Sequence, residues 1–456
     1  MSRLSVLLTS EDWWAVWAGM FLVLLAYVTT AGQWPLDFLK QAIPAPWPAK
    51  PIGASLAAGW PAYVAVYALL LAITATGVRV MGGRLRHYVI AFTLLFVGSF
   101  GVLVIGSQST LKTYGLEYPF WALIIGLLIG NTVNLPGWFR VGAGRTEFYI
   151  KTGIVLLGAS LPFTIVLQGG LWGFLEALII VVAGFTTAFV VARRLGFDNE
   201  FAAVLGAGGS VCGVSAAIAM GSSVKAQQKQ VGYVVSLVVL YALALIFILP
   251  LLARLLDLGQ VVTGAWIGGS ELADAAGLAA AAMVGETAVK AFTLVKLNRD
   301  IMIGVLAFVF ATVAVTRWQR QPAGAGNAGS VAARGAATTA AQGTSAASRP
   351  SAMIIWERFP KFVLAFLLVS FFVTSLVLMW GQPAVNAHIT GVLNVFRTWL
   401  FTVAFLCIGL NTRLADVRAM GARPIIAFTA VVLVNLLLGF VLSHLFFGGI
   451  IAAPLG

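Results

Sequence analysis

Two apolar stretches decide the fold of this chain: FAAVLGAGGSVCGVSAAIAMGS at residues 201–222 and TGAWIGGSELADAAGLAAAAMVGETAV at residues 263–289. Both are long enough to enter a lipid bilayer, but they are rich in Gly, Ser and Ala and poor in Leu, Ile and Phe. The triplet GGS at 208–210 recurs at 268–270, and an Ala-rich segment follows each copy. Because glycine costs a helix about 1 kcal/mol per residue relative to alanine, we expect a helix break in each stretch.

A helix break inside hydrocarbon exposes backbone N–H and C=O groups, which are tolerated only where protein or a water-filled cavity satisfies them. A half-helix that begins near Ser210 would direct free N–H groups and a positive dipole end at such a cavity, and Ser215 adds a hydroxyl. This arrangement suits a bound anion. The backbone and hydroxyl donors that we expect at the site are those of Gly208, Gly209, Ser210, Gly268, Gly269 and Ser270.

Each stretch has two possible geometries: a broken helix that crosses the bilayer, or a re-entrant hairpin that returns to the side it came from. The hairpin is slightly favoured, since it places Lys225 and Lys229 on the same side as the other basic connections. It also brings the two GGS tips toward the midplane from opposite sides.

The rest of the chain has the composition of a membrane protein. Of its 456 residues, 60% are hydrophobic and 9% are charged, and the mean hydropathy is +0.98. Soluble domains carry about 25% charged residues, so a soluble enzyme, a secreted disulfide scaffold and a nucleic-acid-binding protein are excluded. We expect an all-α polytopic protein of the lipid bilayer with an inverted-repeat transporter architecture. Beside the two glycine-rich stretches, about eleven spanning helices are predicted, at 14–30, 58–79, 87–106, 118–133, 148–167, 171–192, 231–251, 301–316, 360–380, 394–410 and 424–446.

The charges predict an orientation. Lys and Arg number 28 and Asp and Glu number 15, a net charge of +13, and most of the excess lies in short connections between apolar spans. These basic connections alternate with connections that carry almost no positive charge. Because Lys and Arg accumulate on the cytoplasmic side, we expect an inner-membrane protein with a cytoplasmic N-terminus and a C-terminus outside.

The predicted organisation has four parts. Residues 1–84 form an N-terminal extension with two transmembrane helices, 85–317 the first part of a transporter core, 318–358 a flexible cytoplasmic linker, and 359–456 the C-terminal part of the core. The linker is predicted from its low-complexity Ala, Gly, Ser and Thr composition.

A weak internal repeat relates KTGIVLLGASL at 151–161 to RTWLFTVAFLCIGLNTRL at 397–414. In the predicted topology the first runs outward and the second inward, which is the pattern of inverted-repeat transporters.

Charged residues inside the apolar stretches are candidate functional groups. Glu271 and Asp274 are three residues apart and share one helix face, so they are candidates to bind a coupling proton or Na⁺; solvated carboxylates at the outer surface are an equal alternative. Lys290, Lys296 and Arg299 either line an anion path or form a helix-end charge network. The three histidines and two cysteines are dispersed, and we predict no metal site, no cofactor and no enzymatic activity.

Four regions resemble the YeiH-like family of sulfate exporters, within the broad cation/anion antiporter group. They are KTGIVLLGASL at 151–161, GGSVCGVSAAIA at 208–219, GAWIGGSELADAAGLAAA at 264–281 with the following Val-Lys-Leu-Asn-Arg, and TWLFTVAFLCIGLNTRLADVRAMGARP at 398–424. The resemblance extends over roughly 85–456. This chain departs from the family at Glu271-Leu272, where the family often has Ile-His.

The resemblance implies a secondary transporter that moves sulfate or a related sulfonate by alternating access, with discontinuous helices around the substrate and a homodimeric scaffold. It adds Cys212, Gly213 and Ser215 to the predicted substrate-binding residues. An Na⁺- or H⁺-coupled carrier of an organic anion is the alternative. An intramembrane enzyme would require convergent acid–base or metal-binding residues, and a channel would pass current without counterflow.

Overall fold

The computed structural model describes residues 9–47, 52–113, 116–318, 356, 359–412 and 422–449. Within these ranges every named element is a helix, apart from one isolated backbone bridge between Trp47 and Gln108. The prediction of an all-α fold is confirmed. The predicted linker at 318–358 lies almost entirely outside the described residues.

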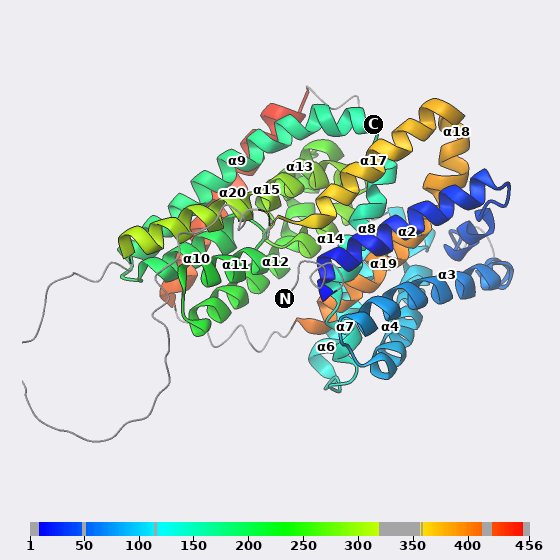
Figure 1. Ribbon diagram of the computed structural model, residues 1–456, viewed down its shortest axis with the longest axis horizontal. Coiled ribbons are helices and arrows are strands. Elements are labelled where there is room, and N and C mark those ends of the chain that lie inside the picture. Colours follow the sequence, from blue (N-terminus) through cyan, green and yellow to red (C-terminus); the bar gives the residue numbers. More distant parts are fainter. Residues whose placement is uncertain are drawn as a thin grey trace, which may run out of the picture.

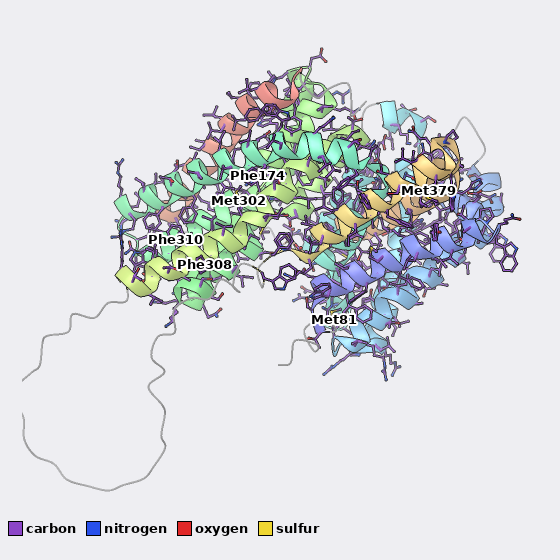
Figure 2. The ribbon with its side chains drawn as sticks, turned by 45° about the horizontal axis from the view of Figure 1, so that its top comes forward. Met81, Phe174, Met302, Phe308, Phe310 and Met379 are labelled. Carbon is purple, nitrogen blue, oxygen red and sulfur yellow. The ribbon has the colours of Figure 1, made fainter. Side chains whose placement is uncertain are left out.

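Nine helices of the described residues are long and apolar enough to cross a membrane. Their outer surfaces are apolar: Phe174 and Met379, for example, are 40% and 74% exposed (Figure 2). The polytopic fold is therefore confirmed. These helices are α2 (Glu11–Ala31), α3 (Ile52–Val80), α4 (Leu85–Gly106), α9 (Phe163–Arg194), α12 (Gln228–Leu255), α15 (Glu286–Val313), α17 (Lys361–Trp380), α19 (Gly391–Asn411) and α20 (Ala422–Phe447).

Two of the predicted spans form shorter helices, α6 (Tyr118–Thr132) and α8 (Thr146–Leu157), so the count of eleven spans stays a prediction. Short helical pieces connect the long helices. They are η1 (Asp37–Ala42), α5 (Ser109–Thr113), α7 (Arg140–Ala143), η2 (Gly158–Ser160), η3 (Ala314–Trp318), α18 (Gln382–Val385) and η4 (Asn386–Thr390).

The helices form two groups, which lie on opposite sides of the molecule (Figure 1). We call α2, α3, α4, α6, α8, α17 and α19 the scaffold bundle, since α19 packs on both α6 and α8, and α2 packs on α8 and α17. The hairpin bundle contains α9, α12, α13 (Gln260–Ser270), α15 and α20, together with the short helices of residues 199–224. One short helix, α14 (Asp274–Val284), lies between the bundles and contacts α6, α8 and α19 of the scaffold.

The first helices of the chain are integral to the scaffold bundle. Arg145, just before α8, and Lys151, within it, pair with Glu11 and Asp12 at the start of α2, at 2.8 and 2.7 Å. These pairs place the starts of α2 and α8 at one side of the molecule, which we call the N-side. The ends of α2 and α8 and the start of α19 then lie at the opposite side, where Ser160 bonds to Asn394 at 2.9 Å.

Candidate functional site

The first glycine-rich stretch forms a re-entrant hairpin. Helix α10 (Asn199–Ser210) ends at the GGS triplet, three residues turn the chain, and α11 (Val214–Val224) follows. Asp198 caps α10 by accepting the N–H of Phe201, and its second oxygen accepts a 2.6 Å hydrogen bond from Gln230 at the start of α12. The start of α10 therefore lies beside the start of α12, so α11 has returned to the side from which α10 came.

The second stretch forms a matching hairpin. Helix α13 (Gln260–Ser270) also ends at its GGS triplet, and α14 (Asp274–Val284) follows a turn at 271–273. Gly285, which links α14 to α15, lies against Gln260: a Cβ atom there would be 2.5 Å from the Gln260 amide oxygen. The hairpin therefore begins and ends at the same side. Both predicted helix breaks are confirmed, and of the two geometries the structure has the re-entrant hairpin.

The two hairpin tips meet at two cations of α15. Lys296 Nζ donates to the carbonyl oxygens of Val211 and Leu272 at 3.0 and 3.1 Å. Arg299 donates to the carbonyl oxygens of Ser210, Gly268 and Glu271 at 2.8–3.2 Å. The last carbonyls of a helix lack partners within it and carry its negative dipole end, so these buried cations stabilise the ends of α10 and α13.

The GGS triplets do not have the position that we expected. The half-helix predicted to begin near Ser210 begins at Val214, so both triplets are the C-terminal ends of helices and present carbonyl groups to the tips. The hydroxyl of Ser210 donates to Gly206 O at 2.6 Å, and that of Ser270 donates to Asn435 O at 3.1 Å. The remaining triplet residues, Gly208, Gly209, Gly268 and Gly269, are buried against side chains of neighbouring helices. The free N–H groups at the tips belong instead to the first turns of α11 and α14.

A polar cavity of about 190 Å³, which we call the tip cavity, lies where the hairpin tips face the scaffold bundle. Cys212 and Ser215 line it, while Gly213 turns the chain beside them with a φ of 67°. The two bundles contribute to its wall together. Asp274, Asp300 and Ile303 also come from the hairpin side, whereas Asp12, Lys151 and Phe362 come from the scaffold.

Charged groups dominate the wall of the tip cavity. Lys151 Nζ lies 2.7 Å from Asp12 and 3.3 Å from Glu147, and Lys296 Nζ lies 3.4 Å from Asp274. Asp300 is 2% exposed, and its Oδ1 atom accepts no hydrogen bond from the described residues.

The two predicted coupling carboxylates are not solvated at an outer surface. Glu271 is fully buried at the second tip, and the side chain of Asp274 is only 11% exposed. This removes the surface alternative. Glu271 Oε1 accepts the N–H of Ala273 at 3.4 Å, so it folds back on its own turn.

A second, larger polar cavity of about 750 Å³ opens at the opposite side, and we call it the vestibule. Lys290 lines it, together with Ser160 and Asn394. Arg397 donates to both carboxylate oxygens of Glu286 at 2.8 and 2.9 Å. Of the three basic residues predicted for an anion path, only Lys290 therefore faces a cavity, because Lys296 and Arg299 are engaged at the tips.

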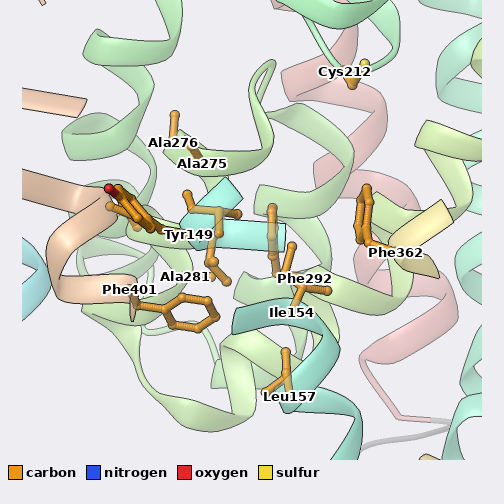
Figure 3. Close-up of a cluster of buried hydrophobic side chains, with 14 of the residues drawn as sticks. Tyr149, Ile154, Leu157, Cys212, Ala275, Ala276, Ala281, Phe292, Phe362 and Phe401 are labelled. Carbon is orange, nitrogen blue, oxygen red and sulfur yellow. The ribbon is translucent and has the colours of Figure 1, made fainter. Parts of the chain in front are cut away.

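Helix α14 connects the two cavities. Its first residue, Asp274, lines the tip cavity, and Glu286, two residues beyond its end, lines the vestibule. Its alanines are buried among large side chains of the neighbouring helices (Figure 3). Labelled in that view are Ala275, Ala276 and Ala281 of α14 with Tyr149, Ile154, Phe292 and Phe401. Most residues of α14 are alanine or glycine, so few long side chains project into its contact with the scaffold bundle.

Several charged residues of the centre were missed by the sequence prediction. Glu176 is a fully buried carboxylate, Asp300 is a buried carboxylate in the wall of the polar tip cavity, and Asp12 and Lys151 reach that cavity from distant segments. A Glu within the apolar stretch 171–192 was a signal that could have identified Glu176.

The fold and its centre define a class: a polytopic membrane protein built around two opposed re-entrant hairpins. The sequence profile of the family described as conserved hypothetical protein 698 matches residues 90–428, and the chain belongs to that family. No solved structure matches it.

Curated relatives support the assignment to a membrane-protein family. A UPF0324 membrane protein of Rhodopirellula baltica is 32% identical over 89% of this chain and 71% of its own length. One of Nitrosomonas europaea is 28% identical over 90% of both chains. One of Nitratidesulfovibrio vulgaris is 30% identical over 82% of this chain, which spans only 62% of that relative.

Proposed function

We propose that this protein is a secondary transporter, rather than an enzyme, that moves sulfate or a related small anion by alternating access. One observation carries the proposal: two opposed hairpin tips meet at the junction of two helix bundles, with a polar cavity on each side of the helix α14 that lies between them. Transporters of this general design bind substrate at discontinuous helices and move one bundle against the other.

The electrostatics of the tips support an anion. Lys296 and Arg299 neutralise the negative ends of α10 and α13, so the helix ends left facing the tip cavity are the N-termini of α11 and α14. Helix N-termini bind anions through their free N–H groups and positive dipole end. Ser215 adds a hydroxyl, and the ammonium groups of Lys151 and Lys296 pair with Asp12 and Asp274, which leaves Asp300 as the carboxylate of the wall that opposes an anion. The resemblance to sulfate exporters makes sulfate the first substrate to test.

Transport of sulfate is tested by counterflow into liposomes that contain the purified protein. Labelled sulfate outside should enter faster when unlabelled sulfate is trapped inside, which a channel would not show. Ser215→Phe should reduce counterflow at least tenfold, because Ser215 is exposed at the cavity wall and a phenyl ring would fill the space. Ser236→Phe on α12 is the matched control. Equal counterflow in the two variants would refute this site.

A specific observation favours a second substrate class, an organic anion carried with H⁺ or Na⁺. The vestibule, at about 750 Å³, is far larger than sulfate requires, and Lys290 and Arg397 lie in its wall. Organic sulfonates that compete with sulfate in counterflow would support this alternative, and sulfate-only exchange would exclude it.

We also propose that the N-side faces the cytoplasm, as positive charges near span ends indicate. Arg145, Arg193 and Lys225 lie near that side, at the start of α8 and at the ends of α9 and α11. A cysteine in place of exposed Lys225 should react with a membrane-impermeant thiol reagent in inverted vesicles but not in intact cells. The opposite pattern would reverse the orientation.

A further inference from the structure

The carbonyl oxygens at the hairpin tips already hold two cations. Those of Ser210, Val211, Gly268, Glu271 and Leu272 all accept hydrogen bonds from Lys296 or Arg299. In transporters with discontinuous helices, unwound carbonyls and helix C-terminal ends are where a coupling Na⁺ binds. Here an ammonium and a guanidinium group that belong to the chain occupy that position, and neither can dissociate.

The buried centre nevertheless has an excess of negative groups. Among the described residues it contains four carboxylates, Glu176, Glu271, Asp274 and Asp300, and two cations, Lys296 and Arg299, an excess of two. An uncompensated charge away from water is very costly, so such groups take up a proton instead. The centre therefore has to bind protons.

Asp300 is the carboxylate best placed to exchange its proton. It lines the tip cavity, it is 2% exposed, and its Oδ1 atom accepts no hydrogen bond from the described part of the chain. Glu176 is also without a hydrogen bond there, but it is fully buried and lines neither the tip cavity nor the vestibule. Asp274 already lies 3.4 Å from the ammonium of Lys296.

The charges around Asp300 favour the binding of one proton in each transport cycle. Asp300 and Asp274 both interact with Lys296, and a single ammonium group cannot neutralise two carboxylates. The other groups around the site are the Arg299 guanidinium on α15, the Cys212 thiol at the first tip, Glu271 at the second, Glu176 on α9, Glu147 and Lys151 on α8, and Asp12 on α2.

We propose that Asp300 is a proton-binding site, and that one proton on Asp300 travels with each anion, independently of Na⁺. This inference rests on the proposed function. With Asp300 ionised, the tip cavity has three carboxylates in its wall, and Lys151 and Lys296 pair with only two of them, Asp12 and Asp274, so the third repels an anion. Protonation of Asp300 removes one of these negative charges, so the proton and the anion bind together and are carried in the same direction.

The test uses the full chain in liposomes with the membrane voltage clamped at zero. A gradient of one pH unit, acid outside, should raise sulfate accumulation about tenfold, because one proton accompanies each anion. A tenfold inward Na⁺ gradient at equal pH should have no effect. A trapped pH dye should report acidification of the lumen when sulfate enters.

Asp300→Asn cannot exchange a proton at this position, so it should lose the sulfate accumulation driven by the pH gradient, and any counterflow that it retains should not change with pH. Asp257→Asn, in the connection between α12 and α13, is the matched control and should keep both the accumulation and the counterflow. Thermal unfolding establishes that the Asp300 variant is folded.

The outcomes separate the two proposals. If the wild-type protein shows no counterflow, the proposed function fails, and this inference fails with it. If counterflow is present but Na⁺ drives accumulation, or the pH gradient does not, only the proton site is overturned. Accumulation driven by pH in Asp300→Asn would assign the proton to another group, which also overturns the proposal.

Discussion

At the scale of single residues, Arg299 is one of two side chains that join the two hairpins, the other being Lys296. Its guanidinium contacts the carbonyl oxygens of Ser210, Gly268 and Glu271 and is fully buried. Lysine has the same charge but lacks the planar set of donors that can reach both tips at once. The planar shape of the Arg299 guanidinium, and not only its charge, is therefore needed to hold the two hairpin tips together.

Arg299→Lys should lower the free energy of unfolding by about 2 kcal/mol, since charged hydrogen bonds to two helix ends are lost. Arg299→Met should cost about 3–5 kcal/mol, because the carbonyls and the nearby carboxylates lose their buried counter-charge. Thermal unfolding in detergent measures both. Arg254→Lys, at the exposed end of α12, is the control. If the Arg299 and Arg254 lysine variants unfold alike, the joining role of Arg299 is wrong.

A second charged cluster, at the side opposite the N-side, joins η1, which lies outside the membrane-spanning helices, to His388 of η4. Lys40 Nζ lies 2.8 Å from one oxygen of Asp37, and His388 Nδ1 lies 2.5 Å from the other. Burial is the largest single influence and would raise the pKa of Asp37, but the hydrogen bonds and charges of Lys40 and His388 together outweigh it and lower the pKa. The cluster ties η1 to the start of the α19 region.

Because the pKa of Asp37 is lower in the folded state than its ordinary value of 3.8, the ionised form stabilises the fold above that value. The contribution is lost as the pH falls through the lowered pKa. At pH 7 we expect Asp37→Asn to cost less than about 1 kcal/mol, because the pair is partly exposed and screened. Unfolding temperatures of both proteins should converge in acid; a difference that persists there would contradict the linkage.

At the scale of secondary-structure elements, glycine allows α6 and α19 to approach closely. A Cβ on Gly126 would lie 2.4 Å from Leu406 O, and one on Gly130 would lie 2.6 Å from Leu410 O. These oxygens belong to helix backbone and cannot move aside. The spacing of the two glycines places both on one face of α6.

Gly130→Leu should therefore force α6 and α19 apart and lower the free energy of unfolding by about 1–3 kcal/mol. Gly101→Leu on α4 is matched in size and in helical context, and nothing lies within 4 Å of its Cβ position. Its unfolding temperature should equal that of the wild type or exceed it, since leucine is the better helix former. Equal losses in both variants would show that close approach is not the reason for Gly130.

The helices and helix breaks were predicted well from the sequence where neighbouring residues determine them. Crowded glycines predicted both helix breaks, and the apolar stretches predicted the long helices. We expected a half-helix to begin at the first GGS triplet, but both triplets lie at the C-terminal end of a helix. Most of their glycines allow close packing instead: Gly208 lies against Val234 and Gly209 against Val431. The glycine that turns the first tip with a positive φ is Gly213.

The site was less predictable, because its partners are far apart in the chain. Asp12 and Lys151 reach the tip cavity from α2 and α8, and Asn435 bonds to Gly209 O from α20 at 2.7 Å. Such contacts depend on how helices pack, and no local pattern encodes them. Lys296 and Arg299 were recognised as functional candidates, but their role at the helix ends required the tips to be in place.

At the scale of the whole molecule, the two bundles meet at a small number of elements. Helix α14 contacts α6, α8 and α19, and α9 contacts α17, where Phe163 packs on Phe371. Arg397 of α19 also pairs with Glu286 of α15, and Phe120 of α6 packs on Phe247 of α12. If the proposed alternating access operates, the hairpin bundle has to move relative to the scaffold bundle, with α14 at the contact between them.

This movement predicts that a covalent link across the tip cavity stops transport. Asp12→Cys places a thiol on the scaffold wall, opposite the native Cys212 of the hairpin wall, and Cys407 is fully buried. A short cleavable bifunctional thiol reagent should join residues 12 and 212, abolish sulfate counterflow, and allow it to return after cleavage.

The control is Asp12→Ser treated in the same way. It lacks the second thiol, so it should lose activity only through modification of Cys212, which cleavage also reverses. The decisive comparison is therefore between the two variants at equal Cys212 labelling, established by mass spectrometry. If the linked protein exchanges sulfate as fast as the singly modified Asp12→Ser protein, the bundles do not move against each other at this cavity during transport.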